Sequence, residues 1–166
     1  MNVLDDYMVD PRLSLLDKAK IQAQVLVPVL RALRAELGTD KADALMRQAL
    51  RDWSKQLFAD VGDSVEGSPR RKWAAMQSAL TEITEREVTF EMIRHDKEAM
   101  EFDVTDCRFA EFFRALGEPE LGALLVCATD FDIVAASKGE VGLTRDQTLM
   151  QGAPSCKFRY KFAPRT

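Results

Sequence analysis

Hydrophobic residues recur every three or four positions through the first half of the chain, which is the period of an amphipathic helix. One run reaches Gly38, a common C-cap residue, and a second begins near Asp40, where Thr39 can act as the cap. Pro28 lies inside the first run, removes a backbone donor and predicts a kink or a break there. The apolar positions are Leu13, Leu16, Ile21, Val25, Val29 and Leu33 in the first helix and Ala42, Leu45, Met46, Ala49, Leu50, Trp53, Leu57 and Phe58 in the second.

A third helix is predicted after a loop from Gly62 to Pro69 that is rich in glycine, serine and acids. Arg70 to Ile83 then returns to helical spacing through Trp73 and Met76. We assign the tryptophans and the phenylalanines at helical spacing to the core, because large aromatic side chains dominate core packing.

Beyond about Glu85 the pattern changes to the two-residue alternation of strands. His95 to Lys97 would form the turn of a first hairpin, and Gly152 the turn before the last strand. The predicted strands are Val88–Ile93, Phe102–Thr105, Glu140–Leu149 and Cys156–Phe162, with helices at Cys107–Leu116 and from Glu118 onward.

This order of elements predicts an α+β fold in which a helical N-terminal half packs on an antiparallel sheet formed by the C-terminal half. At 166 residues the chain suits a single domain, 1–166, with residues 1–10 as a polar leader. A single layer of helix over one face of the sheet would leave room for a small-molecule pocket between the two.

Composition narrows the function. The chain is 46% hydrophobic and 30% charged, which is typical of a globular protein. Its net charge of -4, with basic residues scattered among acids, argues against nucleic acid as a partner. The N-terminus does not resemble a secretory signal, and no stretch approaches the roughly 18 apolar residues of a membrane span. We therefore expect a cytoplasmic protein without a membrane partner, with a homo-oligomer left open.

Three cysteines are the first candidates for chemistry. Cys107 opens a predicted helix, where the positive end of the helix dipole would lower its thiol pKa. Cys127 closes a predicted helix three residues before Asp130, so a thiol and a carboxylate can meet for base-assisted attack on an electrophilic carbon. Cys156 begins the last strand. Core packing is the alternative interpretation for each of the three thiols.

A zinc site is a second functional interpretation, with His95 or Asp130 as the fourth ligand. Structural zinc sites use close cysteine pairs, whereas these cysteines are 20 and 29 positions apart. The sequence therefore predicts no metal and no cofactor. His95 lies between Arg94 and Asp96 and is predicted as a solvated turn residue.

The C-terminal run from Thr144 to Tyr160 is similar to a family signature that reads approximately Arg-Thr-Lys-Thr-Leu-Ala-Glu-Gly-Asp-x-x-Cys-Asp-Phe-Arg-Phe. The matching positions are Arg145, Thr148, Leu149, Gly152, Cys156, Phe158 and Arg159. The chain thus resembles the L-2-amino-thiazoline-4-carboxylic acid hydrolases. Gly117-x-Pro119-Glu120-Leu121 and Cys127-x-x-Asp130 also look like the family's pattern, whereas Gln151, Ala153 and Lys157 stand where the family tends to have acids.

The resemblance implies a hydrolase that acts on the carbon–nitrogen bonds of a cyclic amidine-like substrate. Such an enzyme would open a small sulfur–nitrogen heterocycle such as 2-aminothiazoline-4-carboxylate. Under this hypothesis Cys127 or Cys156 is the thiol nucleophile or transition-state partner, with Cys107 as a further candidate, and Asp130 is the general base. Arg159 or Arg145 would bind the substrate carboxylate, with Thr148 also in the substrate site. If a missing acid at 151, 153 or 157 were the family's proton carrier, this protein would lack it.

Two other functions are compatible with the same residues. One is a non-catalytic small-molecule-binding domain similar to the vinyl-reductase-type sensor domains, which also combine helices, an antiparallel sheet and cysteine-bearing C-terminal strands. The other is an interaction protein that assembles through its helical half.

Overall fold

The computed structural model describes residues 12–63 and 65–164, apart from the side chains of residues 54–63. The predicted leader and the side chains of Leu57 and Phe58 lie outside the described residues. The helices are α1 (Leu15–Leu37), α2 (Thr39–Asp63), α3 (Pro69–Ile83), α4 (Arg108–Ala115), α5 (Pro119–Gly122), the π-helical turn η2 (Ala123–Cys127), α6 (Thr129–Ala135) and the 3₁₀ turn η3 (Leu149–Gln151). The strands are β1 (Val88–His95), β2 (Ala99–Cys107), β3 (Val141–Thr144) and β4 (Cys156–Phe162).

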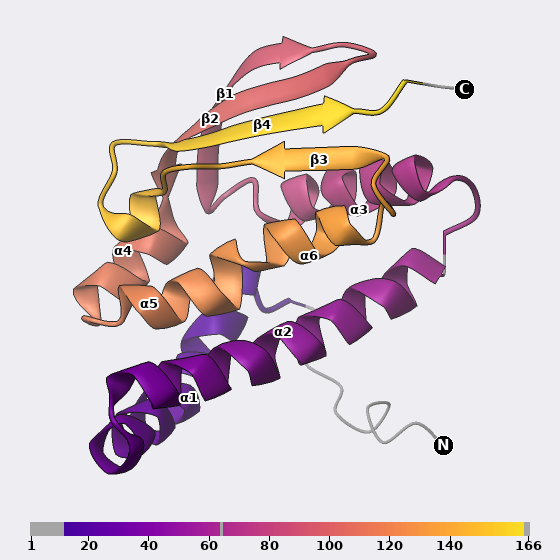
Figure 1. The fold of residues 1–166 in the computed structure, drawn as a ribbon. Helices are drawn as coiled ribbons and strands as arrows, with labels where there is room; N and C mark the ends of the chain where they lie inside the picture. Colours follow the sequence, from indigo (N-terminus) through magenta and orange to yellow (C-terminus); the bar gives the residue numbers. More distant parts are fainter. Residues whose placement is uncertain (1–11, 64, 165–166) are drawn as a thin grey trace.

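The α+β prediction is confirmed: three helices precede a four-stranded antiparallel sheet with the strand order β1-β2-β4-β3. All of the helices lie on one side of the sheet (Figure 1). The predicted single helical layer is wrong, however, because α3 and α6 lie between the sheet and the pair formed by α1 and α2 (Figure 1). The buried apolar residues form two clusters: one joins α1 and α2 to α4, α5 and η2, and the other lies under the sheet.

Helix α1 continues through Pro28, so the predicted break does not occur. The Ser14 side chain caps its first turn by accepting from the Asp17 backbone N–H at 3.0 Å. Pro28 cannot donate to the carbonyl of Gln24, and both residues are exposed, so water can satisfy that carbonyl.

The buried face of α1 differs from the predicted one. Ile21, Val25 and Val29 are 50%, 63% and 45% exposed. Alanines complete the stripe that packs inward, because their small side chains allow close approach of α4 and α5. That stripe is Leu16, Ala19, Ala23, Val27 and Leu30. In α2, Leu45 and Trp53 are likewise exposed, so the prediction that they belong to the core is wrong.

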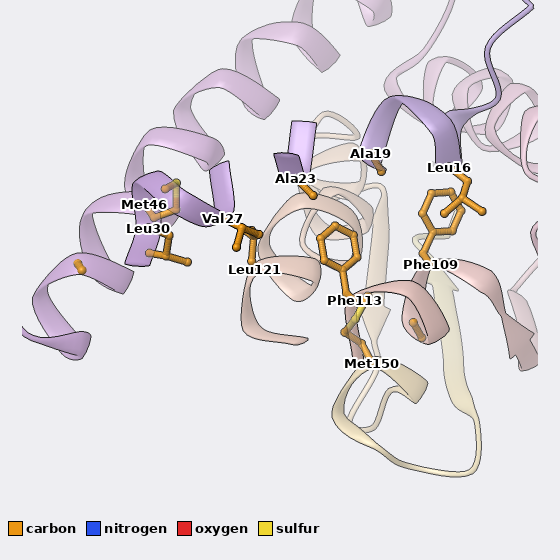
Figure 2. Packing of buried hydrophobic residues seen from close by; sticks show 12 residues of the cluster. Leu16, Ala19, Ala23, Val27, Leu30, Met46, Phe109, Phe113, Leu121 and Met150 are labelled. Atoms are coloured by element: carbon orange, nitrogen blue, oxygen red, sulfur yellow. The ribbon is translucent and has the colours of Figure 1, made fainter. Parts of the chain in front are cut away.

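Figure 2 shows how this stripe is covered. Leu121 of α5 faces Val27, and Phe113 of α4 lies between α1 and Met150 of η3 (Figure 2). Phe113 and Leu121 have no exposed surface. Cys107 to Gly122 is thereby held against the first helix, which positions the segment that follows.

The second cluster lies under the sheet. Trp73 and Met76 of α3 and Ile133 of α6 pack against alternate residues of β2 and β4, among them Phe102 and Tyr160. The opposite sheet face carries the intervening polar side chains, because successive strand residues point to opposite faces.

Strand boundaries differ from the predicted ones in β1, β2 and β3, and β2 runs from Ala99 to Cys107 instead of Phe102 to Thr105. β1 extends to His95, so the turn is Asp96 to Glu98, where Asp96 accepts from the Glu98 and Ala99 backbone N–H groups. β3 ends at Thr144 rather than Leu149. Thr148 begins η3 instead, with its hydroxyl accepting from the Gln151 N–H at 3.2 Å.

Candidate functional site

Cys127 and Asp130 lie on one helical segment that runs from α5 through α6. The segment is nearly continuous because η2 widens the helix by one residue: the Ala128 N–H donates to the Ala123 carbonyl five residues back at 2.8 Å. Cys127 is the last residue of this π-helical turn, and α6 resumes after Ala128. The segment lies between β3 and α2 (Figure 1), so its side chains can meet the loop after β3.

Arg145, the first residue after β3, connects that loop to the helical segment. Its guanidinium forms a short ion pair with the Asp130 carboxylate and donates to the Cys127 carbonyl oxygen at 2.8 Å. The side chain is 5% exposed and its carbon Cζ lies 5.1 Å from the ring centre of Phe131 and 5.0 Å from that of Phe158. A guanidinium between two aromatic rings is favourably placed for cation–π attraction.

The Asp130 carboxylate is largely buried, and one of its two oxygens makes no hydrogen bond to the described residues. Burial raises the pKa of Asp130 to about 6, although the charge of Arg145 and its hydrogen bond act in the opposite direction. Its side chain is 16% exposed, and Oδ1 has no hydrogen-bond partner among the described residues. A carboxylate that titrates near neutral pH and keeps one oxygen accessible is suited to general-base chemistry.

The three thiols lie near this ion pair. The charges of Arg145 and Asp130 act on the pKa of both Cys127 and Cys156, and Cys107 interacts electrostatically with Cys156. The Cys156 sulfur also accepts from the Leu149 backbone N–H at 3.1 Å. The structure therefore brings together residues that the sequence separates by up to 49 positions, from Cys107 to Cys156.

The ionisation state of the thiols differs from the expected one. Burial raises the pKa of Cys127 to about 12 and also raises the pKa of Cys107 and Cys156. At Cys107 the backbone N–H groups of Phe109 and Ala110 lower the thiol pKa, as predicted for a helix N-terminus, but the burial effect is larger. The prediction of a lowered Cys107 pKa is therefore wrong.

Tyr160 and Trp73 belong to the same side of the sheet and were not predicted as site residues. Their rings are 5.2 Å apart, and the charges of Asp130 and Arg145 act on the Tyr160 hydroxyl. Burial raises the Tyr160 pKa. The Tyr160 hydroxyl, Trp73 Nε1 and Arg145 Nε are buried without a hydrogen-bond partner among the described residues. Because strand residues alternate, the sequence could have placed Tyr160 on the same face of β4 as Cys156. The contact of Trp73 with this face depends on how α3 packs, which the sequence pattern does not show.

Other predicted residues lie elsewhere. Arg159 is on the opposite face of β4, where it pairs with Asp103 at 2.7 Å and donates to the Phe102 carbonyl oxygen. Thr148 is engaged in capping η3. His95 is at the far end of the β1–β2 hairpin from Cys107, about 20 Å away at the usual rise per strand residue. Among the described side chains, those of residues 12–53 and 65–164, no three His, Cys, Asp or Glu residues are grouped as metal ligands.

The sequence predicted a pocket between the helices and the sheet, but the groove in the structure is not lined by the sheet. A groove of about 670 Å³ lies instead among α2, the α4–α5 turn, η2 and η3. Neither the thiols nor Asp130 and Arg145 line it.

The profile of one protein family, L-2-amino-thiazoline-4-carboxylic acid hydrolase, matches residues 18–160. The chain belongs to this family. The match extends from α1 to β4 and therefore includes the Asp130–Arg145 pair and all three thiols of this hydrolase-family chain. No curated protein matches the chain. None of the described helices of this family member is both long and apolar enough to cross a membrane.

Among solved structures, this hydrolase-family chain is similar to the phenol-responsive sensory domain of the transcription activator PoxR, crystallised with phenol. The TM-score is 0.50 at 16% sequence identity, over 82% of this chain and 72% of that one. At that identity the similarity concerns the fold.

Proposed function

We propose that this chain is a hydrolase that opens a small sulfur–nitrogen heterocycle such as 2-aminothiazoline-4-carboxylate, with Asp130 as the general base. The observation that carries the proposal is the buried Asp130–Arg145 pair, in which the carboxylate pKa is raised to about 6 and one oxygen has no partner among the described residues. Membership of the hydrolase family supports the reaction class.

In the proposed reaction Asp130 takes a proton from a water molecule while the water oxygen bonds to the amidine carbon. The ring carbon–sulfur bond then breaks, and the protonated Asp130 returns its proton to the departing sulfur, which gives a carbamoyl-cysteine and restores the carboxylate. A base with a pKa near the working pH is both deprotonated and strong enough to accept the proton. Arg145 is a positioning residue here, because its bonds to Asp130 and to the Cys127 carbonyl hold the carboxylate in place.

The three thiols are not assigned as nucleophiles in this proposal. A thiol with a pKa of about 12 is protonated at neutral pH, and the thiolate is the attacking species. Water activated by Asp130 is therefore the favoured nucleophile, and Cys127 and Cys156 shape an apolar wall beside it. Arg159 lies on the other face of the sheet and is not assigned to the substrate carboxylate. The guanidinium of Arg145 is already engaged by Asp130 and the Cys127 carbonyl oxygen.

The direct test is to incubate the purified protein with L-2-aminothiazoline-4-carboxylate and to follow carbamoyl-cysteine by mass spectrometry. Asp130→Asn should abolish product formation while keeping the helical circular-dichroism spectrum. Asp146→Asn is the matched control, because Asp146 is an exposed acid beside Arg145 and should leave turnover unchanged. Equal turnover in the Asp130→Asn protein would refute the base assignment.

A small-molecule-binding domain without catalysis is the second candidate. It is favoured by the unpaired, buried polar atoms of Tyr160 and Trp73 beside the ion pair, since buried polar groups normally have partners. The phenol-responsive domain with the same fold supports it at the level of fold. Under this alternative, thiazoline carboxylates would raise the melting temperature of the protein without being consumed.

A further inference from the structure

The groove among the helices is separate from the Asp130 site. Its volume of about 670 Å³ lies in the range of roughly 300–1,000 Å³ that small-molecule sites occupy. Helix α2 contributes Asp43 and Arg47, the end of α4 contributes Arg114, and the η3 turn contributes Met150 and Gly152.

The two arginines of the groove are uncommitted. Neither Arg47 nor Arg114 forms an ion pair or a side-chain hydrogen bond within the described part of the chain, and both are exposed. Asp43, by contrast, is already neutralised, because Arg34 donates to both of its oxygens at 2.7 and 3.0 Å. Glu120 also lines the groove without a described partner. Two free guanidinium groups against one free carboxylate leave the groove with a positive balance.

Arg114 of α4 lies beside Gly152, the residue that follows η3. Gly152 has a φ of 90°, a left-handed conformation that favours glycine, and a Cβ built on it would lie 3.9 Å from Arg114 Nη2. The guanidinium therefore lies beside a turn that has no side chain of its own. This leaves the planar face and the remaining N–H donors of Arg114 accessible to a ligand.

The rest of the lining is apolar apart from Gln151. Pro119, Ala123 and Leu124 form one wall, and Met150, which is 1% exposed, forms part of the floor. Small-ligand sites typically combine such apolar walls with a few charged groups that orient the ligand.

We propose that this groove binds a small molecule with a carboxylate attached to an apolar body, the carboxylate on Arg114 and Arg47 and the body on Leu124 and Met150. A guanidinium can bind a carboxylate through two parallel hydrogen bonds, which distinguishes it from an uncharged isostere. The site is independent of the proposed hydrolysis, because the residues of that reaction do not line the groove.

The test uses phenylacetate and phenylacetamide, which have the same shape and differ in charge, with binding measured by titration of amide resonances in NMR spectra. Phenylacetate should shift the backbone signals of Leu124, Gln151 and Gly152, and phenylacetamide should bind at least about tenfold more weakly. Arg114→Gln and Arg47→Gln should each weaken phenylacetate binding by about fivefold or more, whereas Arg86→Gln, at an exposed arginine outside the groove, should not.

Two further variants keep the outcome clear. Glu120→Gln removes the one free carboxylate and should tighten phenylacetate binding about two- to threefold, a gain that loss of fold cannot produce. Asp130→Asn should leave phenylacetate affinity unchanged, so failure of the hydrolase proposal does not affect this one. The proposal is overturned if phenylacetate does not shift these signals, if the amide binds equally well, or if Arg114→Gln binds like the wild type.

Discussion

Arg145 and Asp130 form an ion pair across fifteen residues of sequence, and the same guanidinium also holds the Cys127 carbonyl oxygen. The pair thus joins the loop after β3 to the helical segment that carries two of the candidate residues. Because burial raises the pKa of Asp130 while Arg145 lowers it, the two side chains together set the pH at which the carboxylate becomes a base.

The first prediction is a pH profile. A general base works only when deprotonated, so kcat/KM for thiazoline opening should rise about tenfold per pH unit below about 6 and level off above it. Steady-state rates between pH 4.5 and 8.5 measure this. A profile that is flat across pH 6 would contradict the assignment of Asp130.

The second prediction concerns Arg145. Its charge lowers the Asp130 pKa, so Arg145→Gln should move the rising limb of the pH profile above pH 6. Arg145→Lys keeps a positive charge and should move it less. Thermal melts followed by circular dichroism establish that both variants are folded. An unchanged midpoint in folded Arg145→Gln protein would show that the pair does not control the titration.

The third prediction concerns the thiols. Because burial raises their pKa values, iodoacetamide at pH 7.5 should label each cysteine at least about 100-fold more slowly in native protein than in urea. Peptide mass spectrometry resolves the three sites. Cys127→Ala should retain most of the turnover of the wild type. Rapid labelling of Cys127 with parallel loss of activity would restore the thiol-nucleophile mechanism.

The fourth prediction concerns packing beneath η3. A Cβ on Gly122 would lie 2.6 Å from Phe113 Cγ and 2.7 Å from both Phe113 Cβ and the Met150 sulfur. Phe113 is fully buried between α1 and Met150 (Figure 2), so it has no space to move. Gly122→Ala should therefore destabilise the fold by about 1–3 kcal/mol, despite the better helix propensity of alanine.

Gly142→Ala is the matched control for that change, because nothing lies within 4 Å of a Cβ at this strand position. Urea unfolding should give it a free energy within about 0.5 kcal/mol of the wild type. Equal stability of the two alanine variants would mean that the Phe113–Met150 contact is loose.

The periodicity of the chain was sufficient to predict the type and order of most elements. Helical spacing identified α1, α2 and α3, and alternation identified β1 and β4, since each period follows from local backbone geometry. The predicted faces were less accurate. Ile21, Val25 and Val29 are exposed because α1 meets its neighbours through alanines, and a hydrophobic scale does not show which apolar stripe a partner helix will cover.

The candidate site divides in the same way. The sequence singled out Asp130, Arg145 and the thiols as residues capable of chemistry, and it predicted that Cys127 and Asp130, three residues apart, can meet. It gave the wrong direction for the pKa of Cys107, because the helix N-terminus is a local effect whereas burial depends on what packs over the thiol. It also could not separate Arg145, which meets Asp130 from the loop after β3, from Arg159, which pairs with Asp103 on the far face of β4.

Local sequence patterns were sufficient for the α+β class, the order of most elements, the resemblance to the thiazoline hydrolases and a set of candidate residues for chemistry. Only the tertiary structure decided that two helical layers cover the sheet, that Arg145 rather than Arg159 meets Asp130, and that the groove lined by Arg47 and Arg114 lies among helices. The difference arises from how far apart along the chain the interacting residues lie. Secondary structure follows from neighbours a few residues apart, whereas desolvation, ion pairing and cavities depend on contacts between segments that are distant along the chain.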